Sequence, residues 1–301
     1  MSSSFNVFGG LMPVDVLFVA VGGSNAGDAL SSVCHPLYRG RKEVDEVTRH
    51  EHAMLPLSCI LNSSAQLEES ERVTLARVWF EGRTVIFGGG GLINHEPHWN
   101  LLINAAIAFS KCTILYGIGQ NRHHGDDSAM APLMLDNENV LYGLRDWNGN
   151  EESYVPCPTC LILPEEEKTR KRSIGILRHA WFPMKFDKDD VNKDTLSEIL
   201  PVSMSLNLFS PQQIFDYIAS SECILTNTYH GYYWSILMGK RALLHGAFSD
   251  KFDFFKCGVT KYVAAVPIEQ QFDALESQTG FREGCVQRNL SFLAKIKERL
   301  E

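Results

Sequence analysis

The sequence has no excess of positive charge. It contains 28 lysines and arginines against 36 aspartates and glutamates, which gives a formal net charge of −8. A surface that follows nucleic-acid phosphates needs many basic side chains, although local basic pockets stay compatible with this balance. We therefore expect no nucleic-acid partner.

Long apolar runs are also missing. The opening MSSSFNVFGGLMP lacks the positive start and continuous apolar stretch of a secretory signal. No later segment offers about 18 uninterrupted apolar residues, the length needed to span a bilayer. These absences predict a soluble, cytoplasmic protein with no integral membrane segment.

Metal and nucleotide motifs are scarce as well. CPTC (157–160) is the one close pair among eight cysteines, and its proline favours a structural turn over redox or metal chemistry. HEPH (95–98) and NRHHGDD (121–127) match no zinc motif, and Pro97 breaks the helical register between the first two histidines. The sequence has neither GxGxxG nor a Walker loop. We predict no metal and no bound cofactor.

Short apolar runs that end in glycine or charge are present instead. They predict strands, and a helical pattern over 98–111 lies between two of them. This alternation is typical of a parallel sheet with helices on both faces. The strands are predicted at 14–21, 84–91, 112–119 and 140–146.

A second set follows the charged segment 163–173, which we interpret as a linker. Ser210 and Pro211 have the types preferred at an N-cap and first helical position, and Gly239 closes a short helix. An amphipathic helix at 285–301 is expected to pack across the back of a domain. Strands are predicted at 173–179, 222–227, 241–245 and 261–266.

The fold class is therefore predicted as α/β, with two doubly wound, Rossmann-like domains and a cleft between them. Residues 1–165 form the first domain and residues 166–301 the second, which includes the terminal helix. Ligands of such sheets bind beyond the carboxyl ends of the strands. The residues just after each apolar run are the candidates for a site.

Two glycine-containing segments follow strands of the first domain. In GGSNAGDALS (22–31), Asn25 and Asp28 would project at the mouth of a helix, although a tight turn capped by Asp28 explains the same pattern. Four consecutive glycines follow at 88–91, and we favour a ligand-facing role for Gly89, Gly90 and Gly91 because a Cβ would prevent close approach there.

Two arginines stand at predicted strand ends. Arg145 with Asp146 ends the fourth strand, and Arg178 with His179 ends the first strand of the second domain. A guanidinium facing a cleft suits a carboxylate or phosphate, while an internal ion pair is the alternative. Spacing alone leaves both open.

The segment TNTYHGYYWSILMGKRALL (226–244) places a histidine after a strand. With Asn227 or Thr228 as the cap, His230 lies in the first helical turn, beside N–H groups without helical partners. That field favours a bound anion and disfavours a protonated imidazole. His230 is therefore predicted to be coupled to an anionic substrate.

Taken in order, these segments resemble the polysaccharide pyruvyl transferase family. NAGDALS, GGGGL, YGIGQN, LRD, CPTCL and TNTYHGYYWSILMGKRAL follow the family's order over most of the chain. Many members carry arginine two residues before the motif histidine, where this chain has Thr228, and Tyr229 replaces a leucine. Arg178, Arg145 or Arg241 would then have to supply the cation.

The resemblance implies a two-domain, GT-B-like fold and transfer of pyruvyl from phosphoenolpyruvate to a sugar as a ketal, in exopolysaccharide biosynthesis. It places phosphoenolpyruvate, the co-substrate, in the second domain and the sugar or lipid-linked oligosaccharide acceptor in the first. Association with a peripheral glycan-assembly machinery fits this role. His230 and Asp28 are the expected catalytic residues, and the expected substrate-binding residues are Asn25, Gly89, Gly90, Gly91, Arg145, Arg178, His179, Thr228, Tyr229 and Gly231. The alternatives are a GT-B glycosyltransferase using a nucleotide sugar and a non-catalytic carbohydrate-binding relative.

Overall fold

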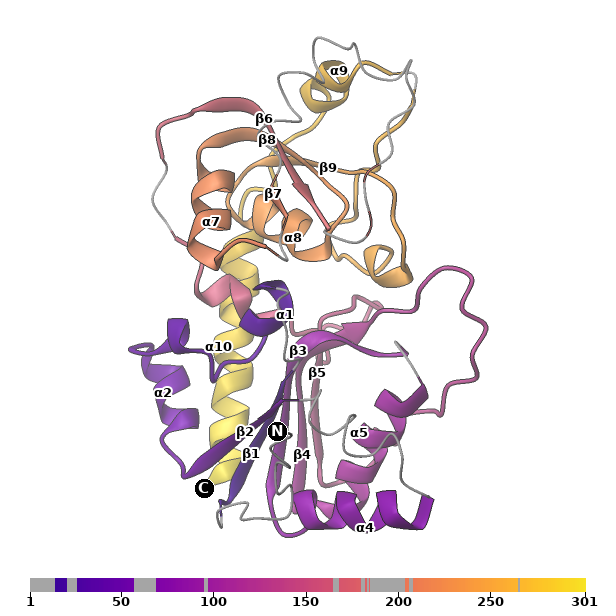
Figure 1. Cartoon of the computed structure of the whole chain (residues 1–301). Coiled ribbons are helices and arrows are strands. Elements are labelled where there is room, and N and C mark those ends of the chain that lie inside the picture. The colour runs from indigo at the N-terminus through magenta and orange to yellow at the C-terminus, as the bar shows by residue number, and fades with distance from the viewer. Residues whose placement is uncertain are drawn as a thin grey trace, which may run out of the picture.

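The computed structural model describes residues 14–20, 26–56, 69–94, 97–164, 168–179, 182, 184, 204–205, 208–264 and 266–301. Two parallel β-sheets, each with helices packed on it, make up a mixed α/β fold (Figure 1). Asn25 and His95 lie outside the described residues.

The N-terminal sheet has five parallel strands in the order β2-β1-β3-β4-β5. The buried run VLFVA forms β1 and pairs with β3 from Val16↔Thr84 to Ala20↔Gly88. Strands are added outward on both sides of β1, so the order reverses between β1 and β3, where ligands of such sheets bind. The strands are β1 (Val16–Ala20), β2 (His52–Pro56), β3 (Thr84–Ile93), β4 (Cys112–Gln120) and β5 (Val140–Leu144).

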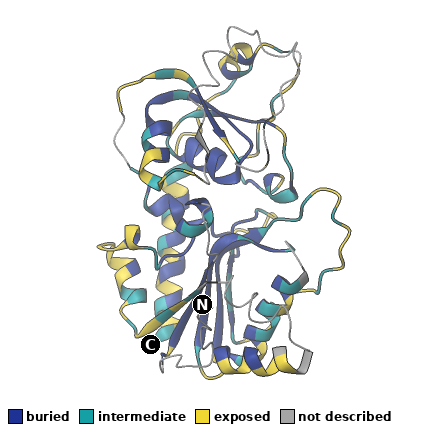
Figure 2. Ribbon diagram, viewed as in Figure 1, coloured by how far each residue is buried: buried dark blue, intermediate teal, exposed yellow. Residues whose placement is uncertain are grey.

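Helices cover both faces of this sheet. Alternate side chains of β1 divide between two cores, because Leu17 and Val19 pack with α4 (Glu69–Phe80) and α5 (Pro97–Phe109). Val16 and Phe18 belong to the larger core, on the face of α1 (Ala26–Leu30), α2 (Lys42–Thr48) and α10 (Phe281–Leu300). Figure 2 shows the central strands β1, β3 and β4 buried between these layers. The short helix η1 (Pro36–Tyr38) joins α1 to α2.

The C-terminal sheet has the order β7-β6-β8-β9, also parallel, and reverses between β6 and β8. One face carries α7 and α8, and the other carries a small core with α9. Ser210 caps α7 in a capping box with Gln213, and Pro211 takes the first position, as predicted. The elements are β6 (Arg172–Arg178), β7 (Met204–Ser205), α7 (Pro211–Ala219), β8 (Ser221–Thr226), α8 (Tyr229–Leu237), β9 (Arg241–Leu244), η4 (Asp250–Phe252) and α9 (Ile268–Asp273).

The terminal helix α10 runs beside both halves of the molecule (Figure 1). Phe292 lies 5.3 Å from the ring of Tyr116 in β4, and Lys297 reaches Glu46 of α2 at 3.3 Å. The Asn289 amide donates to the Pro156 carbonyl at 3.1 Å, beside η2 (Pro158–Leu161). The helix predicted as part of the second domain therefore also packs on the N-terminal sheet.

One predicted strand is wrong, and two strands were not predicted. Residues 261–264 and 266 form no strand, and a single bridge joins Lys261 to Leu244. Val263 is 55% exposed, so this apolar run has no core to cover it. β2 and β7 escaped the sequence analysis because β2 is a half-exposed edge strand and β7 has two residues.

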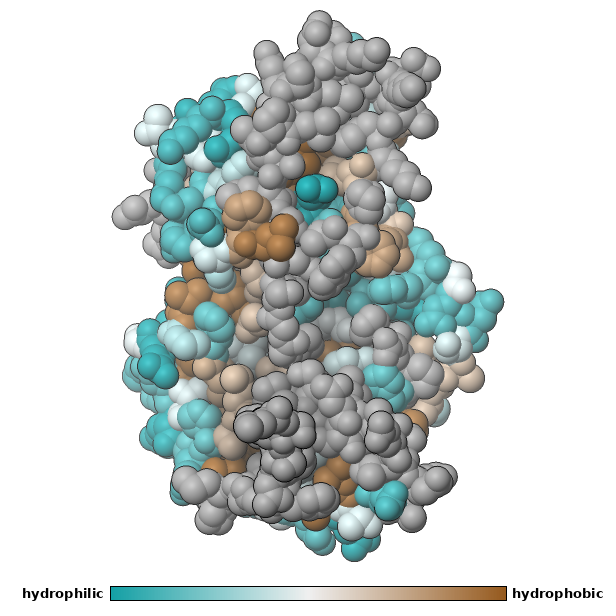
Figure 3. Space-filling model, viewed as in Figure 1, coloured by the Kyte–Doolittle hydropathy of each residue, from teal (hydrophilic) through white to brown (hydrophobic). Residues whose placement is uncertain are grey.

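Within the described residues, no helix is long and apolar enough to cross a membrane. On the face seen in Figure 3, hydrophilic residues cover much of the outer edges, and apolar residues gather toward the waist of the molecule.

Candidate functional site

The carboxyl ends of the two sheets meet around the N-terminus of α8. After β8 ends at Thr226, Thr228 turns the chain and accepts a hydrogen bond from the Gly231 N–H at 3.0 Å. Thr228 is thus the N-cap of α8, one of the two predicted caps, and His230 lies in the first turn with 4% exposure. The free N–H groups and dipole of this end favour a negative ligand.

His230 contacts the other half of the molecule directly. A Cβ on Gly27 of α1 would lie 2.0 Å from the imidazole Nδ1, so only glycine fits there. On the other side of the ring, Nε2 lies 3.5 Å from the Cys157 Sγ. Packing against His230 therefore requires glycine at position 27. The same close approach brings the neighbouring residue, Asp28, to this junction.

The pKa of His230 is well below its usual range. Burial is the main cause, and the positive charges of Arg145 and Lys251 add to it. The imidazole is therefore neutral at neutral pH and can accept a proton. The thiol of Cys157 is also neutral, because burial raises its pKa despite the hydrogen bond that Thr159 donates at 3.3 Å.

Arg145 is a buried guanidinium at the end of β5. It lies 4.1 Å above the ring of Tyr229, and Nη2 donates to the Gln120 carbonyl at 3.1 Å. Its Nε makes no hydrogen bond, and the nearest carboxylate, Asp146, is 3.6 Å away. Arg145 is thus part of an internal ion pair and also a donor with unused capacity, so the ion-pair interpretation is confirmed and anion binding stays a prediction.

Two carboxyl groups near Arg145 have raised pKa values. Burial raises the pKa of Asp146 to about 6, opposed by Arg145 and by a backbone N–H from Gln120. Burial also raises the pKa of Asp28, opposed by Lys251 and then Arg145. Asp28 in its protonated form can donate a proton, the opposite function to that of the neutral His230.

Sequence reasoning missed Lys251. It lies in η4, after β9, and its ammonium sits 4.5 Å from the ring centroid of Phe248. Burial lowers its pKa to about 7, helped by Arg145 and opposed by Asp28 and Asp250. A lysine in SDKF just after a strand's carboxyl end was a usable signal, since ligands bind at those ends.

Contacts with the N-terminal half hold the Lys251 segment in place. The Arg122 N–H donates to the Asp250 carboxylate at 2.9 Å, and the Asp250 N–H donates back to the Arg122 carbonyl at 3.0 Å. The His124 N–H donates to the Phe248 carbonyl at 3.2 Å. These bonds fix η4 between the two sheets.

The end of β6 contributes His179 and Arg178 differently. The His179 N–H donates to the Asn227 side chain at 2.8 Å, across the reversal point between β6 and β8. Burial, Lys251 and His123 lower the pKa of His179 to about 4. Arg178, the other predicted anion-binding arginine, is exposed, and among the described residues it makes no contact with Arg145.

Arg241 is the other arginine considered as a replacement for the family's cation. It begins β9 and pairs with Glu222 at 2.7 Å and Asp273 at 3.5 Å. The amino end of a parallel strand lies away from the end that carries His230. Arg241 is therefore an internal ion pair and does not replace that cation.

The glycines of β3 have protein neighbours. A Cβ on Gly89, whose φ is +49°, would lie 2.1 Å from Ser31, and one on Gly91 would lie 2.5 Å from Asn121. Gly90 has a φ of 87°. In α8, a Cβ on Gly231 would lie 2.4 Å from the Thr226 side chain. Ser31, directly after α1, lies close to Gly89, and the Arg145 Nη2 would lie 3.1 Å from a Cβ on Gly91. These close approaches explain why β3 has glycines here.

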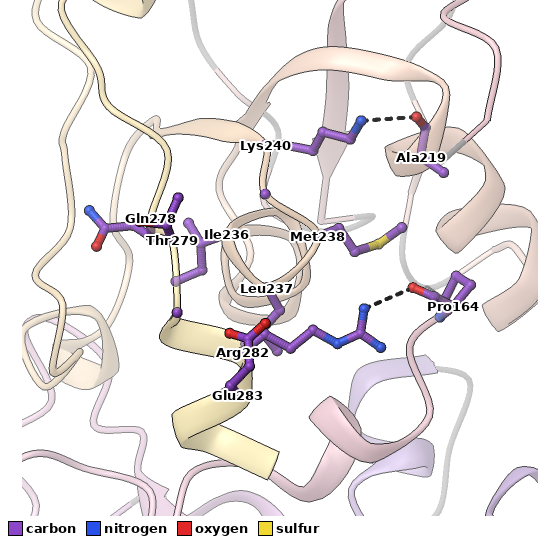
Figure 4. A pocket seen from close by; sticks show the side chains of 12 residues that line it. Pro164, Ala219, Ile236, Leu237, Met238, Lys240, Gln278, Thr279, Arg282 and Glu283 are labelled. Atoms are coloured by element: carbon purple, nitrogen blue, oxygen red, sulfur yellow. Dashed lines mark hydrogen bonds between the residues drawn. The ribbon is translucent and has the colours of Figure 1, made fainter. Parts of the chain in front are cut away.

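A pocket of about 360 Å³ opens elsewhere, at the other end of α8 (Figure 4). Two positively charged side chains that line this pocket are hydrogen-bonded to the protein itself. Lys240 donates to the Ala219 carbonyl at 3.1 Å, and Arg282 donates to the Pro164 carbonyl at 3.0 Å. We therefore place the candidate site at His230. Within the described ranges, no group of three or more metal-ligating side chains is placed to hold an ion.

Comparison with protein-family models gives no match for this chain, and comparison with curated proteins gives none either.

Proposed function

We propose that the chain transfers a pyruvyl group from phosphoenolpyruvate to two hydroxyls of a sugar, forming a cyclic ketal. The observation that carries this proposal is the junction of His230, Arg145, Lys251 and Asp28 at the N-terminus of α8. The motif resemblance supports it. A GT-B-like arrangement, with the acceptor bound beside α1 and the donor beside α8, is part of the proposal.

The donor carries a phosphate and a carboxylate, and the site suits both. Arg145, Lys251 and the N–H groups of α8 supply positive potential in a largely buried setting, where electrostatic interactions are strong. Burial keeps His230 neutral, and the charges of Arg145 and Lys251 add to this effect. Anion binding would offset their effect and raise the pKa of His230.

The proton chemistry follows from the opposite pKa shifts of His230 and Asp28. Neutral His230 takes the proton of the attacking hydroxyl as its oxygen bonds to C2 of the enol. Protonated Asp28 gives a proton to C3, which becomes a methyl group. The second hydroxyl then attacks C2, and the bond from C2 to the phosphate oxygen breaks. The phosphate takes the proton of this second hydroxyl and leaves as hydrogen phosphate. His230 returns the proton of the first hydroxyl to Asp28, which restores both groups.

The test uses purified full-length protein with phosphoenolpyruvate and a panel of β-galactosyl, glucosyl and mannosaminyl acceptors, including lipid-linked oligosaccharides. We expect acceptor-dependent release of phosphate. His230→Ala should lower this rate by about 100-fold or more, the usual contribution of a general base. His50→Ala, in the turn after α2, is the matched control and should keep the rate.

Other outcomes separate the alternative functions. Stabilisation by uridine or guanosine diphosphate, with no effect of phosphoenolpyruvate, would contradict the proposal and favour a glycosyltransferase. Saturable sugar binding without phosphate release would favour a non-catalytic carbohydrate-binding protein.

A further inference from the structure

The ammonium of Lys251 lies against aromatic rings. Among the described residues, no hydrogen bond or ion pair holds it, and its close neighbours are the rings of Phe248 at 4.5 Å and Phe252 at 5.5 Å. Cation–π contact compensates only in part for burying a charge. Lys251 therefore occupies a costly position that the fold alone does not explain.

Two other partly buried lysines of the described residues have polar partners. Lys256 also lies over an aromatic ring, 4.4 Å from Trp147, but it pairs with the carboxylate of Glu151. Lys240 donates to the Ala219 carbonyl at 3.1 Å. The lack of a partner thus distinguishes Lys251 from lysines in comparable settings.

Lys251 and Arg145 also repel each other. Each comes from a different half of the molecule, and the neighbouring Asp28 is a weak counter-ion because burial favours its protonated form. The Nε of Arg145 makes no hydrogen bond although the side chain is only 2% exposed. The Lys251 ammonium and the unused Nε of Arg145, beside a helix N-terminus, form a site that an anion would complete.

We propose that Lys251 binds the phosphate group of the donor, with Arg145 beside it, and supplies the cation that Thr228 does not. The side chain of Thr228 carries no positive charge and caps α8 by accepting from the Gly231 N–H, so it cannot act as the cation for the phosphate. The ammonium is a compact charge on a flexible stem, which suits a phosphate that must be held and then released. This inference rests on the proposed function for the identity of the donor but not for the presence of an anion site.

The experiment measures equilibrium binding of inorganic phosphate, phosphoenolpyruvate and uridine diphosphate to the full chain by calorimetry. Lys251→Met should weaken binding of phosphate and phosphoenolpyruvate by about 10- to 100-fold, the loss expected for a charge-assisted hydrogen bond. Lys251→Arg should restore most of it. Lys256→Met, which removes a lysine already paired with Glu151, should change binding by less than about threefold.

The outcomes separate this inference from the proposed function. Binding of phosphoenolpyruvate that is unchanged in Lys251→Met overturns the role of Lys251 and leaves pyruvyl transfer standing. Binding of phosphate or uridine diphosphate that depends on Lys251, without binding of phosphoenolpyruvate, supports the anion site and contradicts the pyruvyl donor. Absence of binding by all three anions to the unmodified protein overturns both.

Discussion

At the scale of single residues, the candidate site is defined by side chains whose pKa values burial has moved away from their ordinary range. His230 is kept neutral and Lys251 has a pKa of about 7, while the pKa of Asp28 is raised. Such shifts cost stability and concentrate at functional sites. Two residue-scale predictions follow from the groups that surround His230.

Cys157 is predicted to orient the His230 ring. Its Sγ lies 3.5 Å from Nε2, and the bond made by one ring nitrogen determines which form the other presents. Cys157→Ala should lower the turnover rate by about 5- to 10-fold, the equivalent of roughly 1 kcal/mol. The KM for phosphoenolpyruvate should stay within about threefold, because no donor contact is removed. Steady-state phosphate release measures both constants.

Two variants control for packing effects at this position. Cys157→Ser keeps a hydrogen-bonding group and should recover most of the turnover rate. Cys160→Ala removes the thiol that accepts from Asn289 and touches no atom of His230, so its turnover rate should match the unmodified chain. Equal losses in both alanine variants would contradict a positioning role for Cys157.

Lys251 is predicted to make stability depend on pH. Its pKa is about 7 in the folded protein and about 10.4 when unfolded, so the unfolded chain binds more protons between these values. The contribution of Lys251 to stability therefore rises with pH over this window. Lys251→Met removes the free-energy cost of burying the charged ammonium. It should therefore increase the free energy of unfolding at pH 7 by about 1 kcal/mol. The gain should shrink toward pH 10.

Urea unfolding at pH 7 and pH 9.5 measures this difference. The charged groups that set the effect, besides burial, are Arg145 and Asp28 of the N-terminal half and Asp250 of η4. Lys256→Met should lose a little stability at both pH values, since it breaks the pair with Glu151. A loss of stability in Lys251→Met at pH 7 would refute the assignment.

At the scale of elements, the site depends on how closely α1 approaches α8. Gly27→Ala would place a Cβ 2.0 Å from Nδ1 of His230, so the helix or the imidazole must move. We expect a loss of about 1–3 kcal/mol in stability, typical of overpacking, together with a lower turnover rate. Thermal unfolding and phosphate release are the measurements.

Gly284 provides a matched control for this prediction. It also lies in a helix, α10, but a Cβ there meets no atom within 4 Å. Gly284→Ala should raise stability by about 0.4–1 kcal/mol, because alanine restricts the unfolded chain. If Gly27→Ala were equally stabilising, α1 would not pack on His230 as the structure indicates.

The elements themselves were largely accessible from sequence, because their signals are local. Buried runs such as VLFVA, and the pair of Ser210 with Pro211, specify a strand and a helix start within a few residues. The position of His230 in the first turn of α8 followed from Thr226 and Thr228 in the same way. Local reasoning failed at residues 261–264, where exposure of Val263 depends on distant packing.

The partners within the site were not accessible, because they depend on contacts between residues far apart in the chain. Cys157 lies 73 positions from His230, and Lys251 is held at the site by contacts between distant segments, such as that of Asp250 with Arg122. The glycines of β3 show the same limit. Their number indicated close approach, but the neighbour that requires it, Ser31, is visible only in the fold.

At the scale of the whole molecule, one core runs through both halves. It includes Ile114 and Tyr116 of the N-terminal sheet, Ile224 of the C-terminal sheet, and Phe292 of α10. A smaller core with Phe272 packs α9 against β6, β8 and β9 of the C-terminal sheet. The site at the junction is therefore held by a continuous apolar layer as well as by the bonds to η4.

This continuity predicts that the two halves unfold together. Phe292→Ala leaves a cavity beside Tyr116 and should reduce stability by about 3–5 kcal/mol, the range for a buried phenylalanine. Because its core spans both sheets, hydrogen exchange should accelerate in β4 and β8 to the same extent, with one calorimetric transition. Phe272→Ala, in the smaller core, should accelerate exchange in β9 and α9 and leave β4 protected. Two outcomes would contradict this prediction: two separate calorimetric transitions in the unmodified chain, or loss of exchange protection in β4 alone after Phe292→Ala. Either would mean that the halves fold independently. The geometry around His230 would then depend on the contacts at η4.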